Sequence, residues 1–166
     1  MTPALRPARA DDAPALAALH VAVWRQTYAH LAPPEAVAHL DKALRQRQWS
    51  AALTDPSRAT WVAEDGDALL GLVSTGTPAE TLFGARGEIR HLYVAATARR
   101  TGLGAQLLQA GRAALARAGF DGTGLGVVAQ NTAARAFYAA MGGREAGVFT
   151  DPGPLWRSDM VLVVWE

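Results

Sequence analysis

Two arginines and two glycines lie close together in the segment Arg99–Gly104, a few residues after the apolar segment Glu88–Val94. A long Ala/Leu-rich stretch with helical spacing follows the glycines. A turn of this kind directs free backbone N–H groups and a helix N-terminus at one point, which is an anion-binding arrangement. Glycine also lets a phosphate approach the backbone closely. The segment therefore predicts a phosphate-bearing ligand at the end of a strand.

Other interpretations of the turn can be compared with the sequence. A P-loop needs a lysine after its last glycine, and the only lysine of the chain is Lys42, so a P-loop is excluded. A dinucleotide fingerprint needs a small residue three positions after Gly104, where Leu107 stands, and a later acidic residue that is lacking. A tight strand-to-helix connection that binds nothing stays open on the glycines alone.

The segment Arg99–Gly104, after a strand that ends in Leu-Tyr-Val, resembles the acyl-CoA-binding motif of the GNAT superfamily of N-acetyltransferases. A second match is Asn131–Gly142, where an Asn, an Ala, a Phe-Tyr pair and a Gly follow at the family's spacing. A weaker third match is the opening Leu5–Ala8, with the aromatic residues of the next segment. Together these matches cover nearly the whole chain.

Hydrophobic periodicity and turn residues predict an α+β fold in β-α-α-β-β-β-α-β-α-β-β order. This order is similar to that of the GNAT fold, a mixed central β-sheet with helices on both faces. At 166 residues, one domain spanning 1–166 is expected. The expected strands are Pro3–Ala8, Thr60–Glu64, Ala68–Thr77, Glu88–Val94, Thr123–Ala129, Arg144–Thr150 and Ser158–Trp165. The expected helices are Asp11–Ala29, with Asp11 or Asp12 as its cap, a helix from Pro34 to about Leu53, Gly102–Ala118 and Asn131–Met141.

The resemblance implies a cofactor site built largely from backbone. One edge of the Glu88–Val94 strand would stay partly unpaired and bind the pantetheine arm of acetyl-CoA like an added strand. By the family's register, the Leu92 N–H would polarise the acetyl carbonyl, and N–H groups from Arg100 to Ala105 would hold the pyrophosphate. The expected cofactor-binding residues are Leu92, Val94, Arg99, Arg100, Thr101, Gly102, Leu103, Gly104, Ala105, Asn131 and Tyr138.

Two side chains are candidates for proton transfer. Tyr138 would protonate the leaving thiolate, because a phenol is a weak acid that donates a hydrogen bond; the competing interpretation is an ordinary core aromatic. Glu88 would take the amine proton, and its competing interpretation is a strand-end carboxylate paired with an arginine. His91 points to the opposite face from Glu88 if the strand is regular, and a bulge would reverse this. Asn131 is expected to cap its helix.

Composition excludes several classes of function. The net charge is +1 and no long basic run occurs, so nucleic acid is not an expected partner. The absence of cysteine excludes disulfides and thiol nucleophiles, and the four histidines lack metal-ligand spacing, so no metal is expected. No apolar run is long enough to span a membrane, so a cytoplasmic location is expected.

We therefore expect an N-acetyltransferase that uses acetyl-CoA as co-substrate and moves the acetyl group directly to a primary amine of a small molecule or peptide. The alternative is a non-catalytic acyl-CoA-binding or regulatory module of the same fold. Aromatic residues near the expected acceptor pocket, such as Trp24, Tyr28 and Trp49, leave the acceptor open between a small amine, an amino-acid analogue and a protein N-terminus. The apolar segment Met160–Trp165 permits a homodimer without requiring it.

Overall fold

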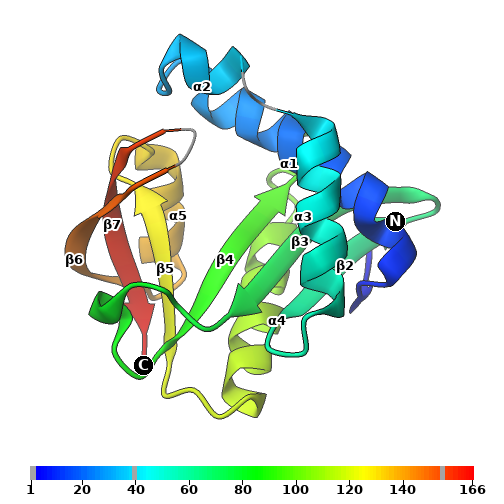
Figure 1. Ribbon diagram of the computed structural model, residues 1–166. Coiled ribbons are helices and arrows are strands. Elements are labelled where there is room, and N and C mark those ends of the chain that lie inside the picture. Colours follow the sequence, from blue (N-terminus) through cyan, green and yellow to red (C-terminus); the bar gives the residue numbers. More distant parts are fainter. Residues whose placement is uncertain (1–2, 39–40, 154–155) are drawn as a thin grey trace.

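A mixed β-sheet organises the protein, whose computed structural model describes all residues except 1–2, 39–40 and 154–155 (Figure 1). Within the described residues the sheet has seven strands in the order β1-β2-β3-β4-β5-β7-β6. Only β4 and β5 pair in parallel, and the other neighbours are antiparallel. The strands are β1 Ala4–Pro7, β2 Ala59–Asp65, β3 Ala68–Gly76, β4 Gly87–Val94, β5 Thr123–Val128, β6 Arg144–Asp151 and β7 Ser158–Trp165. The predicted α+β fold with a mixed sheet is confirmed.

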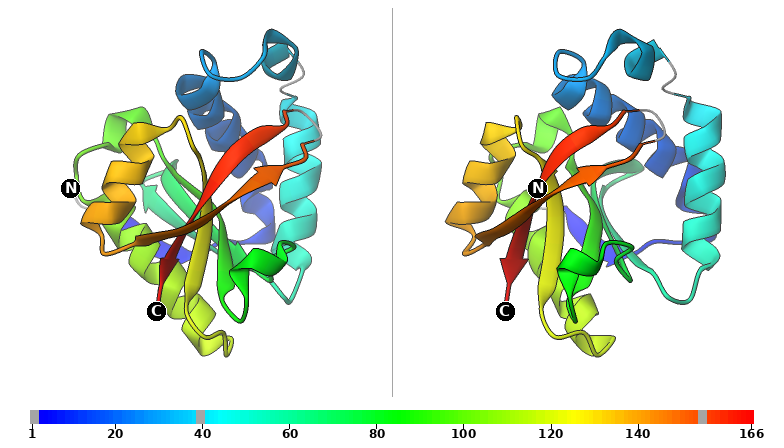
Figure 2. Two further views of the ribbon diagram at one scale, coloured as in Figure 1. Left: turned by 90° about the vertical axis from the view of Figure 1, so that its left-hand side faces the viewer. Right: turned by 60° about the vertical axis from the view of Figure 1, so that its left-hand side comes forward.

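Helices cover both faces of this sheet (Figures 1 and 2). On one face, α1 and α3 pack through residues such as Leu16 and Trp49 against Leu72 of β3. On the other face, α4 packs through Leu107 against Val73, and α5 adds to the same cluster of buried residues. The helices are α1 Ala13–Tyr28, α2 Pro34–Ala38, α3 Lys42–Thr54, α4 Leu103–Arg117 and α5 Thr132–Ala140.

The segment after Pro33 differs from the prediction of one helix to about Leu53. It forms two helices, α2 and α3, with residues 39–40 between them outside the described part of the chain. The cause is a helix cap, since the Asp41 carboxylate accepts the backbone N–H of Ala43 at 2.8 Å and starts a new helix. The element order therefore gains one helix and becomes β-α-α-α-β-β-β-α-β-α-β-β.

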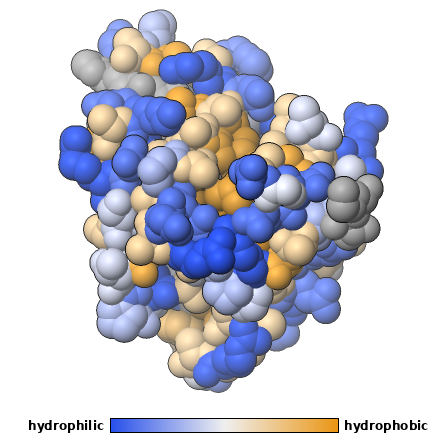
Figure 3. Space-filling model, turned by 90° about the vertical axis from the view of Figure 1, so that its right-hand side faces the viewer, coloured by the Kyte–Doolittle hydropathy of each residue, from blue (hydrophilic) through white to orange (hydrophobic). Residues whose placement is uncertain are grey.

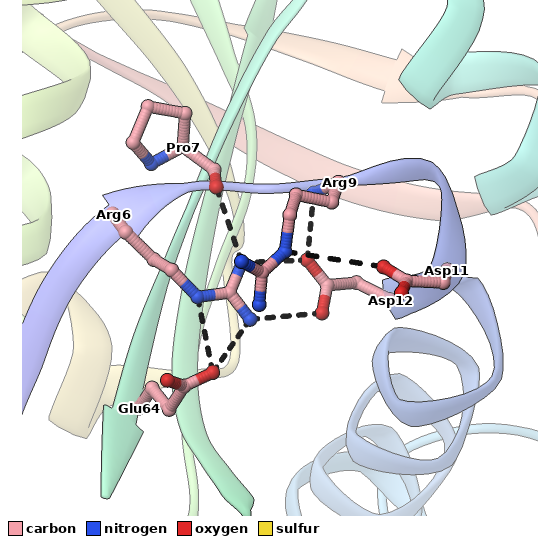
Figure 4. A network of polar contacts seen from close by, with 6 residues as sticks. All are labelled: Arg6, Pro7, Arg9, Asp11, Asp12 and Glu64. Atoms are coloured by element: carbon pink, nitrogen blue, oxygen red, sulfur yellow. Dashed lines mark hydrogen bonds and ion pairs between the residues drawn. The ribbon is translucent and has the colours of Figure 1, made fainter.

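The start of α1 also differs from the prediction, because Asp12 stands at the N-cap but makes no side-chain cap bond. Its carboxylate instead accepts two hydrogen bonds from the Arg6 guanidinium, at 2.8 and 3.0 Å, and one from the Arg9 N–H at 2.7 Å (Figure 4). Arg6 also donates to Glu64 of β2 at 2.6 Å. This network ties β1 both to the start of α1 and to β2.

The loop between β3 and β4 contains a short 3-10 turn, Thr81–Phe83, which is not among the elements expected from the sequence. Phe83 is fully buried against Leu162 and Val164 of β7, so the turn places an aromatic side chain in the core. No helix among the described residues has the length and apolar character that a membrane crossing requires. On the side where α3 and β1 lie, apolar side chains gather in a hollow that polar residues surround (Figure 3).

Candidate functional site

The parallel strands β4 and β5 pair over a very short stretch. Their register contains Gly87 opposite Thr123 and Glu88 opposite Gly124, and no later pair. Beyond that point the two strands diverge toward their C-terminal ends (Figure 1). Residues 89–94 therefore present one strand edge without a β5 partner, as the resemblance had implied, and such an edge can pair with an extended amide-containing ligand.

A cleft of about 820 Å³ lies at this divergence. It is bounded by β4, β5, the turn after β4, the start of α4, α5 and the end of α1. Most of the expected cofactor-binding residues line it, namely Leu92, Val94, Arg99, Arg100, Gly102, Gly104, Ala105, Asn131 and Tyr138. Thr101 and Leu103 are not among the lining residues, because the Thr101 hydroxyl donates to the Ala98 carbonyl at 2.6 Å and the Leu103 side chain is buried in the core.

The turn before α4 has an unusual backbone. Arg100 has a φ of +62° and Gly102 a φ of +83°, both in the left-handed region, and a non-glycine residue there is uncommon. Gly102 is also the N-cap of α4 and offers no side-chain acceptor to the first-turn N–H groups. Alternating backbone conformations with uncapped N–H groups at a helix N-terminus form a concave anion site, so these residues suit a diphosphate.

The two glycines of the turn serve different purposes. A Cβ at Gly102 would meet nothing within 4 Å, so glycine is needed there for its φ and not for space. A Cβ at Gly104 would lie 3.2 Å from Cζ of Phe137, so this glycine allows α4 and α5 to approach each other. Both glycines line the cleft.

Tyr138 lies on α5, buried at 8% exposure, with its ring edge-on to Trp165 at a centroid distance of 5.9 Å. It lines the cleft. Burial, and to a smaller degree the nearby Tyr28 phenol, raises the pKa of Tyr138, so its hydroxyl stays protonated and able to donate. Tyr138 is thus a buried aromatic that also lines the cleft, and its role as the acid stays a prediction.

Asn131 caps α5 as predicted, because its Oδ1 accepts the Ala134 N–H at 3.2 Å. Burial raises the pKa of Tyr28 at the end of α1, and the side chain of Asn131 opposes this shift. Tyr28 and Asn131 both line the cleft, so the end of α1 and the start of α5 both border it. From the sequence alone, Tyr28 was predicted only to lie near the acceptor pocket.

Strand β4 contains a bulge that changes the relation between Glu88 and His91. The register shifts between Ser74 and Thr75 of β3, which leaves Arg90 without a partner. Glu88 and His91 therefore lie on the same face of the sheet, the face of α1 and α3. Opposite faces were expected only for a regular strand, and this strand is irregular, so the alternative of a bulge applies.

His91 belongs to an aromatic cluster that the sequence did not indicate. Its ring centroid lies 5.0 Å from that of His20 and 5.1 Å from that of Trp49. The Trp49 Nε1–H donates to Nδ1 of His20 at 3.1 Å, so the proton of His20 is on Nε2, and burial lowers the pKa of His20 to about 3. His91 lines the cleft, its Nδ1 is buried without a partner, and burial holds its pKa well below the usual range.

The structure places Glu88 outside the lining of the cleft, at the end of β4 that still pairs with β5. Its Oε1 lies 3.8 Å from Nε of Arg90. Burial raises the pKa of Glu88, while Arg90 and Arg58 oppose the shift. A proton-transfer role for Glu88 would therefore act through an intervening group, and it stays a prediction.

Comparison with known proteins agrees with this geometry. Residues 24–142 match the model of the acetyltransferase (GNAT) family. A probable N-acetyltransferase of Mycobacterium tuberculosis is 29% identical over 106 residues, and the matched part spans 63% of this chain and 60% of that relative. The chain thus spans less than two thirds of the length of this curated relative.

Two solved structures of N-acetyltransferases are similar to this chain over nearly its whole length. The PaiA N-acetyltransferase of Thermoplasma acidophilum, in complex with coenzyme A, has a TM-score of 0.80 at 18% identity, with 98% of both chains covered. A ribosomal-protein-alanine N-acetyltransferase of Brucella melitensis has a TM-score of 0.74 at 25% identity, again with 98% of both chains covered. The chain belongs to the GNAT acetyltransferase family, and its fold is that of these enzymes.

Proposed function

We propose that the protein is an acetyl-CoA-dependent N-acetyltransferase that transfers the acetyl group directly to a primary amine. The observation that carries this proposal is the cleft at the divergence of β4 and β5, which brings the turn Arg99–Gly104, the free edge of β4 and Tyr138 together. A diphosphate, an amide-rich arm and a thioester need these three features in this order along one ligand.

Different residues of the cleft would bind acetyl-CoA, polarise its carbonyl and protonate the leaving sulfur. Bound acetyl-CoA supplies a thioester carbonyl carbon that an amine can attack. The N–H groups from Arg100 to Ala105 would hold the diphosphate, and the Val94 backbone would pair with the pantetheine amides. The Leu92 N–H would donate to the carbonyl oxygen and stabilise the charge that grows on it. The Tyr138 hydroxyl would give its proton to the sulfur as the carbon–sulfur bond breaks.

The amine proton has two candidate acceptors, since amines are largely protonated at neutral pH. Glu88 is our first choice, acting through water, because its raised pKa brings the carboxylate closer to the strength that a general base needs. His91 is the reserve, because it lines the cleft and shares the face of Glu88. Its low pKa makes it a weaker base.

The proposal is tested by a titration with acetyl-CoA, followed by a thiol-release assay with a panel of primary amines. We expect binding of acetyl-CoA and release of one thiol per acetylated amine. Binding without release for any amine would favour the non-catalytic acyl-CoA-binding module. Absence of binding would reject both.

A further inference from the structure

Two guanidinium groups lie near His91, one of them in the cleft lining. Arg90 of the β4 bulge lines the cleft beside His91, and Arg58 lies behind it, outside the lining. Arg58, just before β2, donates from Nη2 to the Ser74 hydroxyl at 2.6 Å, and Ser74 is the β3 partner of His91. A Cβ built on Gly76 would lie 2.9 Å from Nε of Arg90 and 3.4 Å from Cγ of Arg58, so the two arginine side chains share the space above this glycine.

These arginines are incompletely paired within the described residues. Nε of Arg58 is buried without a hydrogen-bond partner, although Nη2 of the same group is bonded. Arg90 donates to the Thr77 carbonyl, and its contact with the Glu88 carboxylate, from Nε to Oε1, is a loose 3.8 Å. A buried guanidinium N–H without an acceptor is costly, and a ligand that supplies an acceptor removes the cost.

The charges that act on His91 are positive, because Arg58, Arg45 and Arg90 all lower its pKa. Carboxylates act on the arginines themselves: Asp55 and Glu88 both act on Arg58, and Glu88 lies 3.8 Å from Arg90. The carboxylate of Asp55, near Arg58, is already occupied by the hydroxyl and the N–H of Ser57, at 2.7 and 2.9 Å. The potential beside His91 is thus positive, which attracts anions and repels cations.

We propose that the acceptor is a small primary amine that carries a carboxylate, as an amino acid does, and that Arg58 and Arg90 bind this carboxylate. The inference rests on the proposed acetyltransferase function. Arg90 precedes Leu92 by two residues, or roughly 7 Å of strand. An amine placed at the carbonyl that Leu92 polarises can therefore reach the guanidinium groups with a carboxylate a few bonds away. Polyamines are disfavoured, because they would bring further positive charge to the same place.

The test compares each amino acid with its own amide. L-phenylalanine and L-phenylalaninamide, and L-alanine and L-alaninamide, have the same shape and differ in the charge of one group, and spermidine serves as the cationic amine. We expect kcat/KM to be at least about tenfold higher for the acid of each pair, since charge-assisted bonds to a carboxylate are strong. The expected order opposes intrinsic reactivity, because the amide has the less basic and more readily deprotonated amine.

Variants then test whether Arg58 and Arg90 cause the preference for the acid over the amide. Arg58→Gln and Arg90→Gln should each raise KM for the acid by about tenfold and leave KM for the amide and the affinity for acetyl-CoA unchanged. Arg117→Gln, at an exposed position on the far end of α4, is the matched control and should change none of these values. An equal loss for acid and amide in both the Arg58 and the Arg90 variant would overturn the assignment of these arginines.

The outcomes separate this inference from the function on which it rests. Faster acetylation of the amides or of spermidine than of the acids overturns the inference and leaves the acetyltransferase function standing. Binding of acetyl-CoA without acetylation of any carboxylate-bearing amine also overturns it. A protein that does not bind acetyl-CoA overturns the proposed function, and the inference with it.

Discussion

The Tyr138→Phe variant tests the site most directly, because it removes one oxygen atom and keeps the ring. The ring packs edge-on against Trp165 and beside Phe137, with centroid distances of 5.9 and 5.4 Å, and phenylalanine preserves both contacts. No hydrogen bond of the Tyr138 hydroxyl is found within the described residues, so its loss leaves no protein group unpaired. We therefore expect the free energy of unfolding to change by less than about 1 kcal/mol.

The effect on turnover should be much larger. A positioned general acid contributes roughly 100-fold to 10,000-fold, so kcat should fall by at least about 100-fold, or about 2.7 kcal/mol of barrier. Because burial raises the pKa of Tyr138, ionisation of this hydroxyl should not reduce wild-type activity on the alkaline side of the ordinary assay range.

Three measurements decide the outcome for Tyr138→Phe. Steady-state thiol release gives kcat, calorimetric titration gives the affinity for acetyl-CoA, and urea unfolding gives stability. We expect a loss in kcat alone. A parallel loss of kcat and of acetyl-CoA affinity would show that Tyr138 acts through packing, and a normal kcat would refute the role of its hydroxyl as the acid.

Three further perturbations test other parts of the structure. Glu88→Gln should lower kcat/KM near neutral pH and abolish the acid limb, in which wild-type activity falls as pH drops through the raised pKa of this carboxyl; an unchanged pH profile would remove Glu88 as the base. Gly102→Ala forces a φ of +83° on alanine and should weaken acetyl-CoA binding in titrations, at a stability cost of about 1 kcal/mol. Gly66→Ala, whose glycine has a φ of +62° and equally open space in the β2–β3 turn, should show the same stability cost with normal binding, and equal binding losses would argue against an anion site at Gly102. Asp12→Asn should cost about 1–3 kcal/mol in urea unfolding at pH 7. Because Arg6 holds the pKa of Asp12 below its usual value, this stability is present above the unfolded pKa of about 3.8, and the gap to wild type should close as pH falls through the folded pKa; a gap that persists at low pH would contradict the ion-pair interpretation.

Local patterns predicted most of the fold. The apolar run Ser158–Trp165 is a strand with these same bounds, and the expected strands on either side of Gly66 pair as β2 and β3. The exception after Pro33 has a local cause that could have been read, since Asp41 before a helical segment is a typical cap. Asp12 could not be interpreted in this way, because its partner Arg6 is as good a match for a carboxylate as the helix N-terminus.

The cofactor side of the site was accessible to sequence reasoning because it is continuous in the chain. The turn Arg99–Gly104 and the cap at Asn131 are each defined by neighbouring residues. The acceptor side is assembled from distant ones. His20 and His91 are separated by more than seventy positions, and their contact depends on where α1 crosses β4.

Arg90 is the one residue of β4 that the pairing with β3 skips, and this irregularity determines which β4 side chains face the proposed acceptor side. Without the bulge, strict alternation would put Glu88 and His91 on opposite faces, and one of them would point into the α4 core. With it, both lie on the face of α1 and α3, while Leu92 still packs on the α4 side. No propensity marks this extra residue, because a bulge is set by the pairing with β3 and not by the sequence of β4 alone. In the proposed mechanism the bulge therefore lets one strand bind the carbonyl oxygen at its edge and the amine at its face, and its position is the part of the candidate site that only a structure could supply.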